Sequence, residues 1–213
     1  MSATTLQNKI YFITGNKGKI HEARYAIGEA NFAGSMDTNM TEIQSDDYHE
    51  IIRAKAQSFI DAMKKDWPFD PSGPQEIRAI VEDTGLECAN MNGFPGPYIR
   101  YYFDKLGLEG ICKFNGLSPA TFVSHAAAVI LRRITINQDT QIFEYSQEIK
   151  VFAVRQDGSI TCQPSGSKGF GFDPIFCPAG YYNTTLAEMD LDEKQNCSAR
   201  MQSIRQATDW LGY

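Results

Sequence analysis

Val81-Glu82-Asp83-Thr84-Gly85-Leu86-Glu87 is the stretch that decides the fold, because it ends an apolar run, Ile77 to Val81, with two carboxylates and a Thr-Gly pair. We predict a buried strand for the run and a tight turn at Thr84-Gly85. Glu82 and Asp83 then lie at a strand end, where open α/β sheets bind their ligands. Paired carboxylates beside a turn suit Mg²⁺, which prefers oxygen ligands. A solvated acidic turn between two strands is the alternative.

A strand, loop and helix pattern lies near the start of the chain. Lys9 to Thr14 is a short apolar run that predicts a strand, and Ile20 to Ala30 has helical spacing. The loop between them consists of Gly15, Asn16, Lys17, Gly18 and Lys19. Loop N–H groups and a helix N-terminus bind phosphate, and the two lysines add positive charge. The spacing matches neither a Walker A motif nor G-x-G-x-x-G, so an ordinary strand-to-helix turn remains the alternative.

Composition and charge limit the class of protein. The chain has 213 residues, which we expect to form a single domain over residues 1–213, and its net charge is −6. An acidic chain is poorly suited to a nucleic-acid polymer, although local basic residues can still bind a small anion. The five scattered cysteines form no C-x-x-C pair, so they indicate neither a disulfide framework nor a zinc site. We expect a cytoplasmic protein without a signal peptide or a membrane span.

The segment from Phe32 to Gln44 is predicted to be a second strand that carries Glu42 near its end. Ser45 is a suitable N-cap for a helix that continues to about Lys65. Lys55 lies beside the apolar face of this helix. A lysine in that position usually extends along the surface toward water, and the alternative is that it reaches into a cleft.

The middle of the chain alternates further predicted elements. Strands are expected at Leu86 to Met91, Phe122 to Ile136 and Ile142 to Val154, and helices at Tyr98 to Leu106 and Leu108 to Phe114. The three histidines, His21, His49 and His125, have no motif around them. We therefore interpret them as structural and expect no Ser-His-Asp mechanism.

Glycine alternates with aromatic residues between Ser165 and Phe176, in a segment that includes Phe170, Gly171, Phe172 and Asp173. Glycines let a backbone approach a ligand closely, and an exposed ring can stack on a base. A strand that packs its Phe residues and bends at its glycines is an equal alternative. Farther on, Ser198 is a plausible N-cap for a final helix. Lys194 and Arg200 place cations near the start of that helix, which suits phosphate or base oxygens.

These motifs together resemble those of the inosine triphosphate pyrophosphatase family, also called Ham1-like. The resemblance rests on TGNKGK at 14–19, EDTGL at 82–86, GFPGPYIR at 93–100, GFGFDPIF at 169–176, and AEM at 187–189 with EK at 193–194. The motifs occur in the order of the family and cover nearly the whole chain. A single one of them would be a weak signal, whereas the full set in register is highly specific.

The resemblance implies an α/β fold with an elongated mixed β-sheet flanked by helices, in two lobes with the active site in the cleft between them. It also implies a homodimer and a Mg²⁺-dependent reaction. Inosine, xanthosine and deoxyinosine triphosphates would be cut between the α and β phosphorus atoms, giving the monophosphate and pyrophosphate. Such an enzyme cleanses the nucleotide pool.

The resemblance further assigns a role to each matching position. Thr14 to Lys19 would hold the triphosphate, Lys55 and Thr84 would contact the phosphates or their metal, and Glu42 and Asp83 would ligate Mg²⁺. Asp83 would be the catalytic base, with Glu82 near it. Phe170, in the loop with Gly171 and Phe172, would stack on the base. Asp173 would bond the nucleoside, and Lys194 and Arg200 would complete the pocket.

The chain departs from the family pattern at one site position. Ala199 stands where the family usually has the His of a Ser-His-Arg motif, so that we expect either a weaker selectivity for a 6-oxo purine or a shifted range of substrates. Two other classes of protein remain open. One is a different nucleotide hydrolase, such as a Maf-like pyrophosphatase, a phosphatase acting at the terminal phosphate or a broad nucleoside triphosphatase. The other is a nucleotide-binding regulator without catalysis.

Overall fold

The computed structural model describes residues 9–37, 40–66, 75–137 and 142–213. Its strands are β1 (Ile10–Ile13), β2 (Phe32–Met36), β3 (Glu76–Cys88), β4 (Pro95–Gly96), β5 (Pro119–Asn137), β6 (Ile142–Ile160) and β7 (Phe176–Pro178). Its α-helices are α1 (Lys17–Ile27), α2 (Tyr48–Asp66), α3 (Ile99–Asn115), α4 (Leu191–Lys194) and α5 (Ala199–Trp210). Short 3-10 helices lie at Ala89–Met91 and Asp173–Ile175.

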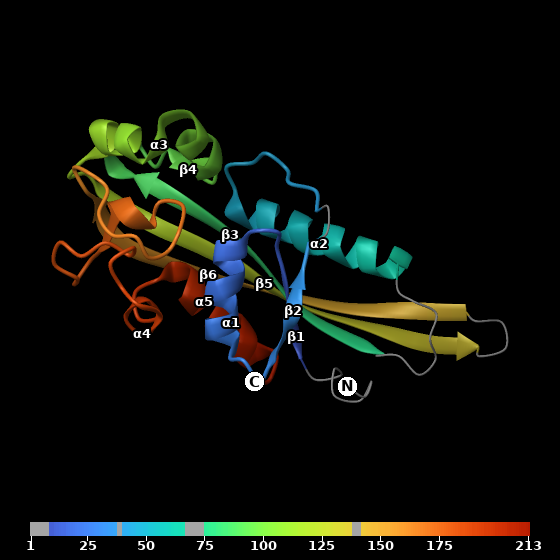
Figure 1. Cartoon of the computed structure of the whole chain (residues 1–213). Coiled ribbons are helices and arrows are strands. Elements are labelled where there is room, and N and C mark those ends of the chain that lie inside the picture. The colour runs from blue at the N-terminus through green and yellow to red at the C-terminus, as the bar shows by residue number, and fades with distance from the viewer. Residues whose placement is uncertain (1–8, 38–39, 67–74, 138–141) are drawn as a thin grey trace.

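The strands form one mixed sheet with the order β2-β1-β3-β5-β6-β7, and β4 pairs with β3. β1 is parallel to β2 and to β3, because α1 and α2 carry the chain back between them. β5 is antiparallel to both β3 and β6, and the long β5–β6 ladder gives the sheet its elongated shape (Figure 1). The expected mixed sheet flanked by helices is therefore confirmed.

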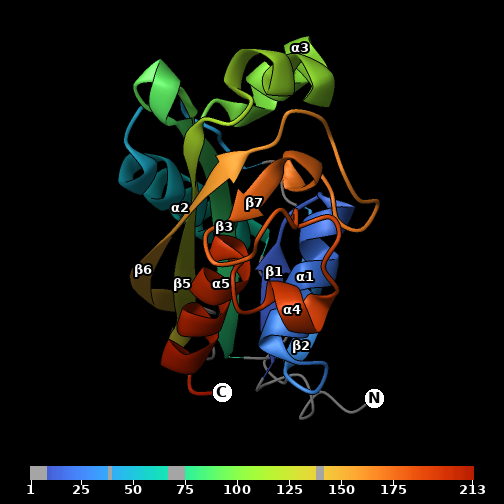
Figure 2. The ribbon, with the colours of Figure 1, turned by 90° about the vertical axis from the view of Figure 1, so that its left-hand side faces the viewer.

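Helices cover the two faces of the sheet, as Figure 2 shows. Side chains alternate along a strand, so neighbouring residues of β3 face opposite helices. Ile80 packs in a core with residues of α1 and α5, and we call this side of β3 the α5 face. Val81 packs in a separate core with residues of α2, and we call that side the α2 face. A third core lies beside α3 and β7 at one end of the sheet.

The predicted turn at Thr84-Gly85 is wrong, because β3 continues without interruption to Cys88. Every residue of β3 pairs with a residue of β5, so the ladder holds the Thr-Gly pair extended. Gly85 is needed for another reason. A Cβ on Gly85 would lie 1.9 Å from the Tyr48 hydroxyl and 2.7 Å from the Gly96 carbonyl oxygen, so the glycine leaves room for two close neighbours.

Other boundaries also differ from the prediction. β2 ends at Met36, well before Gln44. α2 begins at Tyr48, and Asp47 rather than Ser45 accepts the hydrogen bond from the His49 N–H, at 2.7 Å. The strand expected to reach Met91 ends at Cys88. The two helices expected between residues 98 and 114 form α3, which is kinked at Gly107, and the expected cap Ser198 accepts a hydrogen bond from Met201 N–H.

All five cysteines are free thiols. No helix in the described part of the chain has the length and apolar content to span a membrane.

Candidate functional site

One edge of β3 is left open where β1 ends. Ile13, the last residue of β1, pairs with Val81, and β4 begins to pair with β3 only at Leu86. Between these points, Glu82 to Gly85 have no neighbouring strand on this side among the described strands. The chain leaving β1 forms the loop of residues 14–19, so the two predicted motifs meet here. We call this gap the notch.

The loop of residues 14–19 is fixed by its own hydrogen bonds. Asn16 caps α1, because its Oδ1 accepts from the N–H groups of Gly18 at 2.9 Å and Lys19 at 3.2 Å. The helix therefore begins at Lys17 rather than at Ile20. A Cβ on Gly15 would lie 2.6 Å from an Asp37 carboxylate oxygen, so a larger residue there would require the Asp37 side chain to shift. The cap satisfies two N–H groups, so an incoming phosphate would depend mainly on the lysine side chains and the positive end of the helix.

Glu82 lies on the α5 face of the notch and is fully buried between positive charges. Lys19 Nζ is 2.9 Å from its Oε2, and Arg200 Nε is 3.6 Å from its Oε1. Ser124, on β5, donates a hydrogen bond of 2.8 Å to Oε1, and Ser203 Oγ lies 2.9 Å from Ser124 Oγ. Burial by itself would raise the pKa of Glu82, but Lys19 and Arg200 hold this pKa below its ordinary value.

A buried cluster of charges continues from Glu82 along the α5 face. Lys194 Nζ bonds Glu22 and lies 2.6 Å from Asp173 Oδ2, and Arg200 Nη1 donates to Glu22 Oε2 at 2.5 Å. Burial raises the pKa of Asp173, which Lys194 opposes, whereas Arg200 and Lys194 outweigh burial and lower the pKa of Glu22. The Oδ1 atom of Asp173 is buried and has no hydrogen-bond partner in the described structure. The unpaired acceptor Asp173 Oδ1 therefore belongs to the same buried cluster as the cations Lys194 and Arg200.

Glu22 is a site residue that the sequence analysis missed. It is 2% exposed and lies on the buried side of α1, together with Ala23 and Ala26. A glutamate within that apolar stripe was the signal in the sequence. A buried carboxylate nearly always has a partner, so its position indicated a cation nearby. Ser124 and Ser203 were also missed, and their isolated hydroxyls carry no sequence signal.

Phe170 covers this cluster. Arg200 Cζ lies 4.6 Å from the centroid of its ring, and the Phe170 N–H donates to Asp173 Oδ2 at 2.9 Å. A Cβ on Gly18 would lie 2.3 Å from the ring, so the ring rests directly on the backbone of the 14–19 loop. Gly169 and Gly171, at φ +92° and +60°, allow this path of the chain. The ring therefore joins the two predicted ligand loops.

Phe172 and Ala199 belong to the core rather than to this surface. Phe172 is 5% exposed and packs edge-to-face on Phe122, with ring centroids 5.0 Å apart. The ring of Phe172 faces the interior while that of Phe170 does not, so the predicted part of Phe172 in binding the substrate stays a prediction that its ring does not support. Ala199 is fully buried in the same core cluster as Phe172. Phe172 and Phe176 thus meet the expectation that Phe residues of this segment pack inside, whereas Phe170 covers the charge cluster.

Asp83 lies on the α2 face of the notch. Lys55, from α2, places Nζ 2.5 Å from Asp83 Oδ1 and 3.2 Å from Glu42 Oε1. Burial lowers the pKa of Lys55, but Asp83 and Glu42 raise it above its ordinary value, and Lys55 in turn lowers the pKa of Glu42. Lys55 thus reaches inward, which was the alternative to an extension toward water. Thr84 lies on the opposite face, because it alternates with Asp83 along β3.

The oxygen atoms around Lys55 suit a magnesium ion. Glu42 and Asp83 converge on one positive charge, and the ammonium of Lys55 stands where a cation would be bound. Mg²⁺ is commonly held by one or two carboxylates together with substrate phosphates and water. Within residues 9–37, 40–66, 75–137 and 142–213, no group of three or more His, Cys, Asp or Glu side chains is arranged to hold a metal. Glu42 and Asp83 supply two carboxylates, a number that fits a metal shared with substrate phosphates and water.

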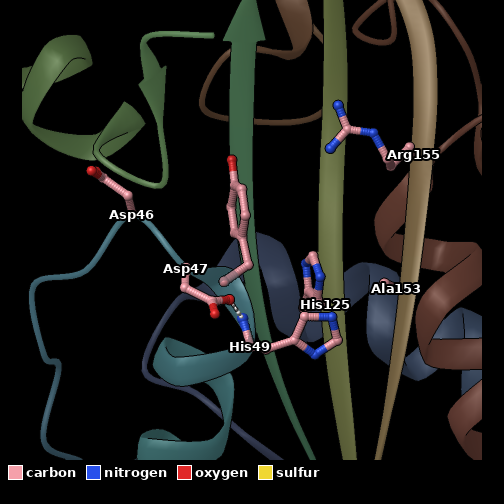
Figure 3. Close-up of a pocket in the computed structure, with 7 residues that line it drawn as sticks. Asp46, Asp47, His49, His125, Ala153 and Arg155 are labelled. Atoms are coloured by element: carbon pink, nitrogen blue, oxygen red, sulfur yellow. Dashed lines mark hydrogen bonds between the residues drawn. The ribbon is translucent and has the colours of Figure 1, made fainter.

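A hollow of about 610 Å³ lies farther along the α2 face (Figure 3). Its lining residues are Asp46, Asp47, Tyr48, His49, His125, Ala153 and Arg155. The Tyr48 and His125 rings stack with centroids 5.0 Å apart, and burial lowers the pKa of His125 to about 4. None of the predicted site residues lines this hollow. It adjoins the site, since His125 is the partner of Asp83 across the sheet.

Comparisons with known proteins agree with the motifs. The model of the Ham1 family matches residues 10–210. The chain is 31% identical over 204 residues to a dITP/XTP pyrophosphatase of Thermococcus kodakarensis, covering 95% of this chain and 97% of the relative. It is 29% identical to an inosine triphosphate pyrophosphatase of Leishmania major, covering 95% and 92%. A HAM1 protein structure from Coxiella burnetii has a TM-score of 0.66 at 21% identity, covering 95% and 98%, which shows a shared fold.

Proposed function

Because this chain belongs to the Ham1 family, we propose that it hydrolyses inosine, deoxyinosine and xanthosine triphosphates to the monophosphate and pyrophosphate. The observation that carries this proposal is that Glu82 and Asp83, which are neighbours on β3, contact different groups of charged residues on opposite faces of the sheet. Glu82 meets the buried charge cluster on one face, and Asp83 meets Lys55 and Glu42 on the other. Both residues border the notch, so a nucleotide lying across it would present its base to one face and its phosphates to the other.

The α5 face suits a 6-oxo purine. Such a base carries an acceptor at position 6 and a donor at N1. Lys194 and Arg200 supply donors, and Asp173 Oδ1 supplies a buried acceptor without a partner in the described structure. Adenine has a donor at position 6 and an acceptor at N1, so it would leave buried polar atoms of the protein unsatisfied. A site that recognises its ligand by hydrogen bonds rejects such a base strongly. The ring of Phe170 must move from Arg200 for a base to enter, and it then offers a face for stacking.

The α2 face suits the phosphates. Phosphoryl transfer needs its groups held in line and its charge neutralised. Lys55 approaches from α2. Lys17 and Lys19 belong to the 14–19 loop at the edge of the notch, and Lys19 would have to leave Glu82, which it contacts at 2.9 Å, to meet a phosphate on this face. Glu42 and Asp83 are the residues that would hold Mg²⁺, which when bound neutralises phosphate oxygens and makes water more acidic. Asp83, with an oxygen 2.5 Å from Lys55, is the residue that we propose as the base for the attacking water.

The remaining features of the proposal concern the whole molecule. We propose a single domain over residues 1–213, with the family match over residues 10–210 in support. A cleft between two lobes, a homodimer and a location in the cytoplasm remain part of the proposal.

The proposal is tested with a panel of inosine, xanthosine, adenosine and guanosine triphosphates in Mg²⁺, in which pyrophosphate and orthophosphate are measured separately. We expect pyrophosphate from the inosine and xanthosine substrates and little from adenosine triphosphate. Orthophosphate as the first product would favour a terminal phosphatase. Pyrophosphate from all four would indicate a broad enzyme, in line with Ala199 at a position where the family usually has His. No turnover in the panel would contradict the proposal.

A further inference from the structure

Lys55 fills the space between the two carboxylates that are proposed to bind Mg²⁺. Its Nζ lies 2.5 Å from Asp83 Oδ1 and 3.2 Å from Glu42 Oε1. The Lys55 side chain is only 8% exposed and that of Asp83 15%, so water screens this contact weakly. These two carboxylates are the only ion-pair partners of Lys55 in the described part of the chain.

A metal ion and this arrangement of Lys55 exclude each other. Mg²⁺ lies about 2.1 Å from each oxygen that it binds. An ion on Asp83 Oδ1 would then stand within a few ångströms of an ammonium that is itself 2.5 Å from the same oxygen. Two cations at that separation repel strongly where solvent is excluded. Lys55 must therefore leave Asp83 Oδ1 before a metal can bind that oxygen.

A bound polyphosphate would offer Lys55 new hydrogen-bond acceptors in place of Asp83 and Glu42. Lysine is a compact charge on a flexible four-carbon stem and binds phosphate as a point charge. The 14–19 loop, with Lys17 and Lys19, borders the same notch, so phosphates bound there come within the reach of α2. A nucleotide would bring both new acceptors for Lys55 and additional oxygen ligands for the metal.

We propose that Lys55 is a resident counter-ion that keeps divalent cations off Glu42 and Asp83 until a polyphosphate arrives, so that Mg²⁺ enters with the nucleotide. The identity of the nucleotide rests on the proposed function, whereas the block of the metal does not. By linkage, the nucleotide must raise the affinity for Mg²⁺ by the same factor as Mg²⁺ raises the affinity for the nucleotide.

The test is Mg²⁺ binding without nucleotide, measured by calorimetry and by the shift in melting temperature. Lys55→Met removes the counter-ion, and we expect it to bind Mg²⁺ at least about tenfold more tightly than the wild type. Lys55→Arg keeps the charge and should bind as weakly as the wild type. Lys64→Met is the matched control on the same helix, because Lys64 bonds Gln147 at 2.7 Å, away from the notch.

A second measurement keeps the test decisive if Lys55→Met folds poorly. Lys55→Gln removes the charge while retaining a polar group, and it should show the same gain in affinity. In the wild type, a non-hydrolysable α,β-methylene analogue of inosine triphosphate should tighten Mg²⁺ binding by at least about tenfold, and this gain should shrink in Lys55→Gln.

The possible results separate the role of Lys55 from the proposed hydrolysis of nucleotides. Equal Mg²⁺ affinity in the wild type and both uncharged variants would overturn the role of Lys55, even if the nucleotide panel shows hydrolysis. Tight binding of Mg²⁺ by the nucleotide-free wild type would do the same. A gain in Lys55→Met and Lys55→Gln without any nucleotide turnover would contradict the proposed function and leave the role of Lys55 supported.

Discussion

Replacing Asp83 with Asn separates catalysis from stability at the centre of the site. The substitution keeps the size of the side chain and removes the negative charge that faces Lys55. If Asp83 holds the metal and accepts the proton of water, we expect kcat to fall by about 10³ or more, since each role is typically worth that much or somewhat less. A factor of 10³ corresponds to about 4 kcal/mol in the activation free energy.

The effect of this substitution on folding should be much smaller. Lys55 retains Glu42 at 3.2 Å and can still donate to the amide oxygen that replaces the carboxylate. We therefore expect a loss of about 1–2 kcal/mol in the free energy of unfolding, the range for a weakened hydrogen bond to a charged group. In a chain of this size, that loss lowers the melting temperature by about 2–8 °C.

The assay measures kcat with inosine triphosphate and the melting temperature on the same preparations. Glu76→Gln is the matched control, because Glu76 lies on the same strand and pairs with Arg78 at 2.7 Å and Arg132 at 2.6 Å, far from the notch. It should lose a similar amount of stability and keep its rate. An Asp83→Asn variant with a rate within tenfold of the wild type would refute the role of Asp83.

Three further predictions concern other parts of the site. Phe170→Ala should raise KM for inosine triphosphate by about 5- to 150-fold, because base stacking contributes about 1–3 kcal/mol, and an unchanged KM would count against stacking. Ser124→Ala removes the hydrogen-bond donor to Glu82, so it should lower the free energy of unfolding by about 1–3 kcal/mol and reduce kcat. Urea unfolding and steady-state kinetics measure the two effects, and a variant as stable as the wild type would contradict the hydrogen bond. His125 has a pKa of about 4 in the folded chain, so as the pH falls it is protonated in the unfolded chain before it is protonated in the folded chain. This difference should lower the free energy of unfolding between about pH 6.5 and 4, by up to about 2–3 kcal/mol. Melting temperatures at pH 7 and 5 should therefore converge in His125→Phe but not in the exposed control His21→Phe.

Local patterns in the sequence predicted most elements correctly. Apolar spacing located α2, β5 and β6, because one buried stripe per element is visible in the chain itself. The kink of α3 at Gly107 and the cap of α5 at Ser198 also follow from single residues. The prediction failed at Thr84-Gly85, where a distant partner decided the result. Thr84-Gly85 has the composition of a turn, yet pairing with Val123 and Ser124 keeps it in a strand.

The sequence by itself determined the family, the mixed sheet, and the set of acidic, basic and glycine residues from which the site is built, because motif order and periodicity are properties of the chain. Only the tertiary structure decided on which face of the sheet each of these residues lies and which atoms they contact. Continuous pairing of β3 with β5 sends Glu82 and Asp83 to opposite faces, since side chains alternate along a strand. Packing of α1 and α5 on one face then brings Glu22 to Arg200, and packing of α2 on the other brings Lys55 to Asp83. Such contacts join residues far apart in the chain, and no local pattern encodes them.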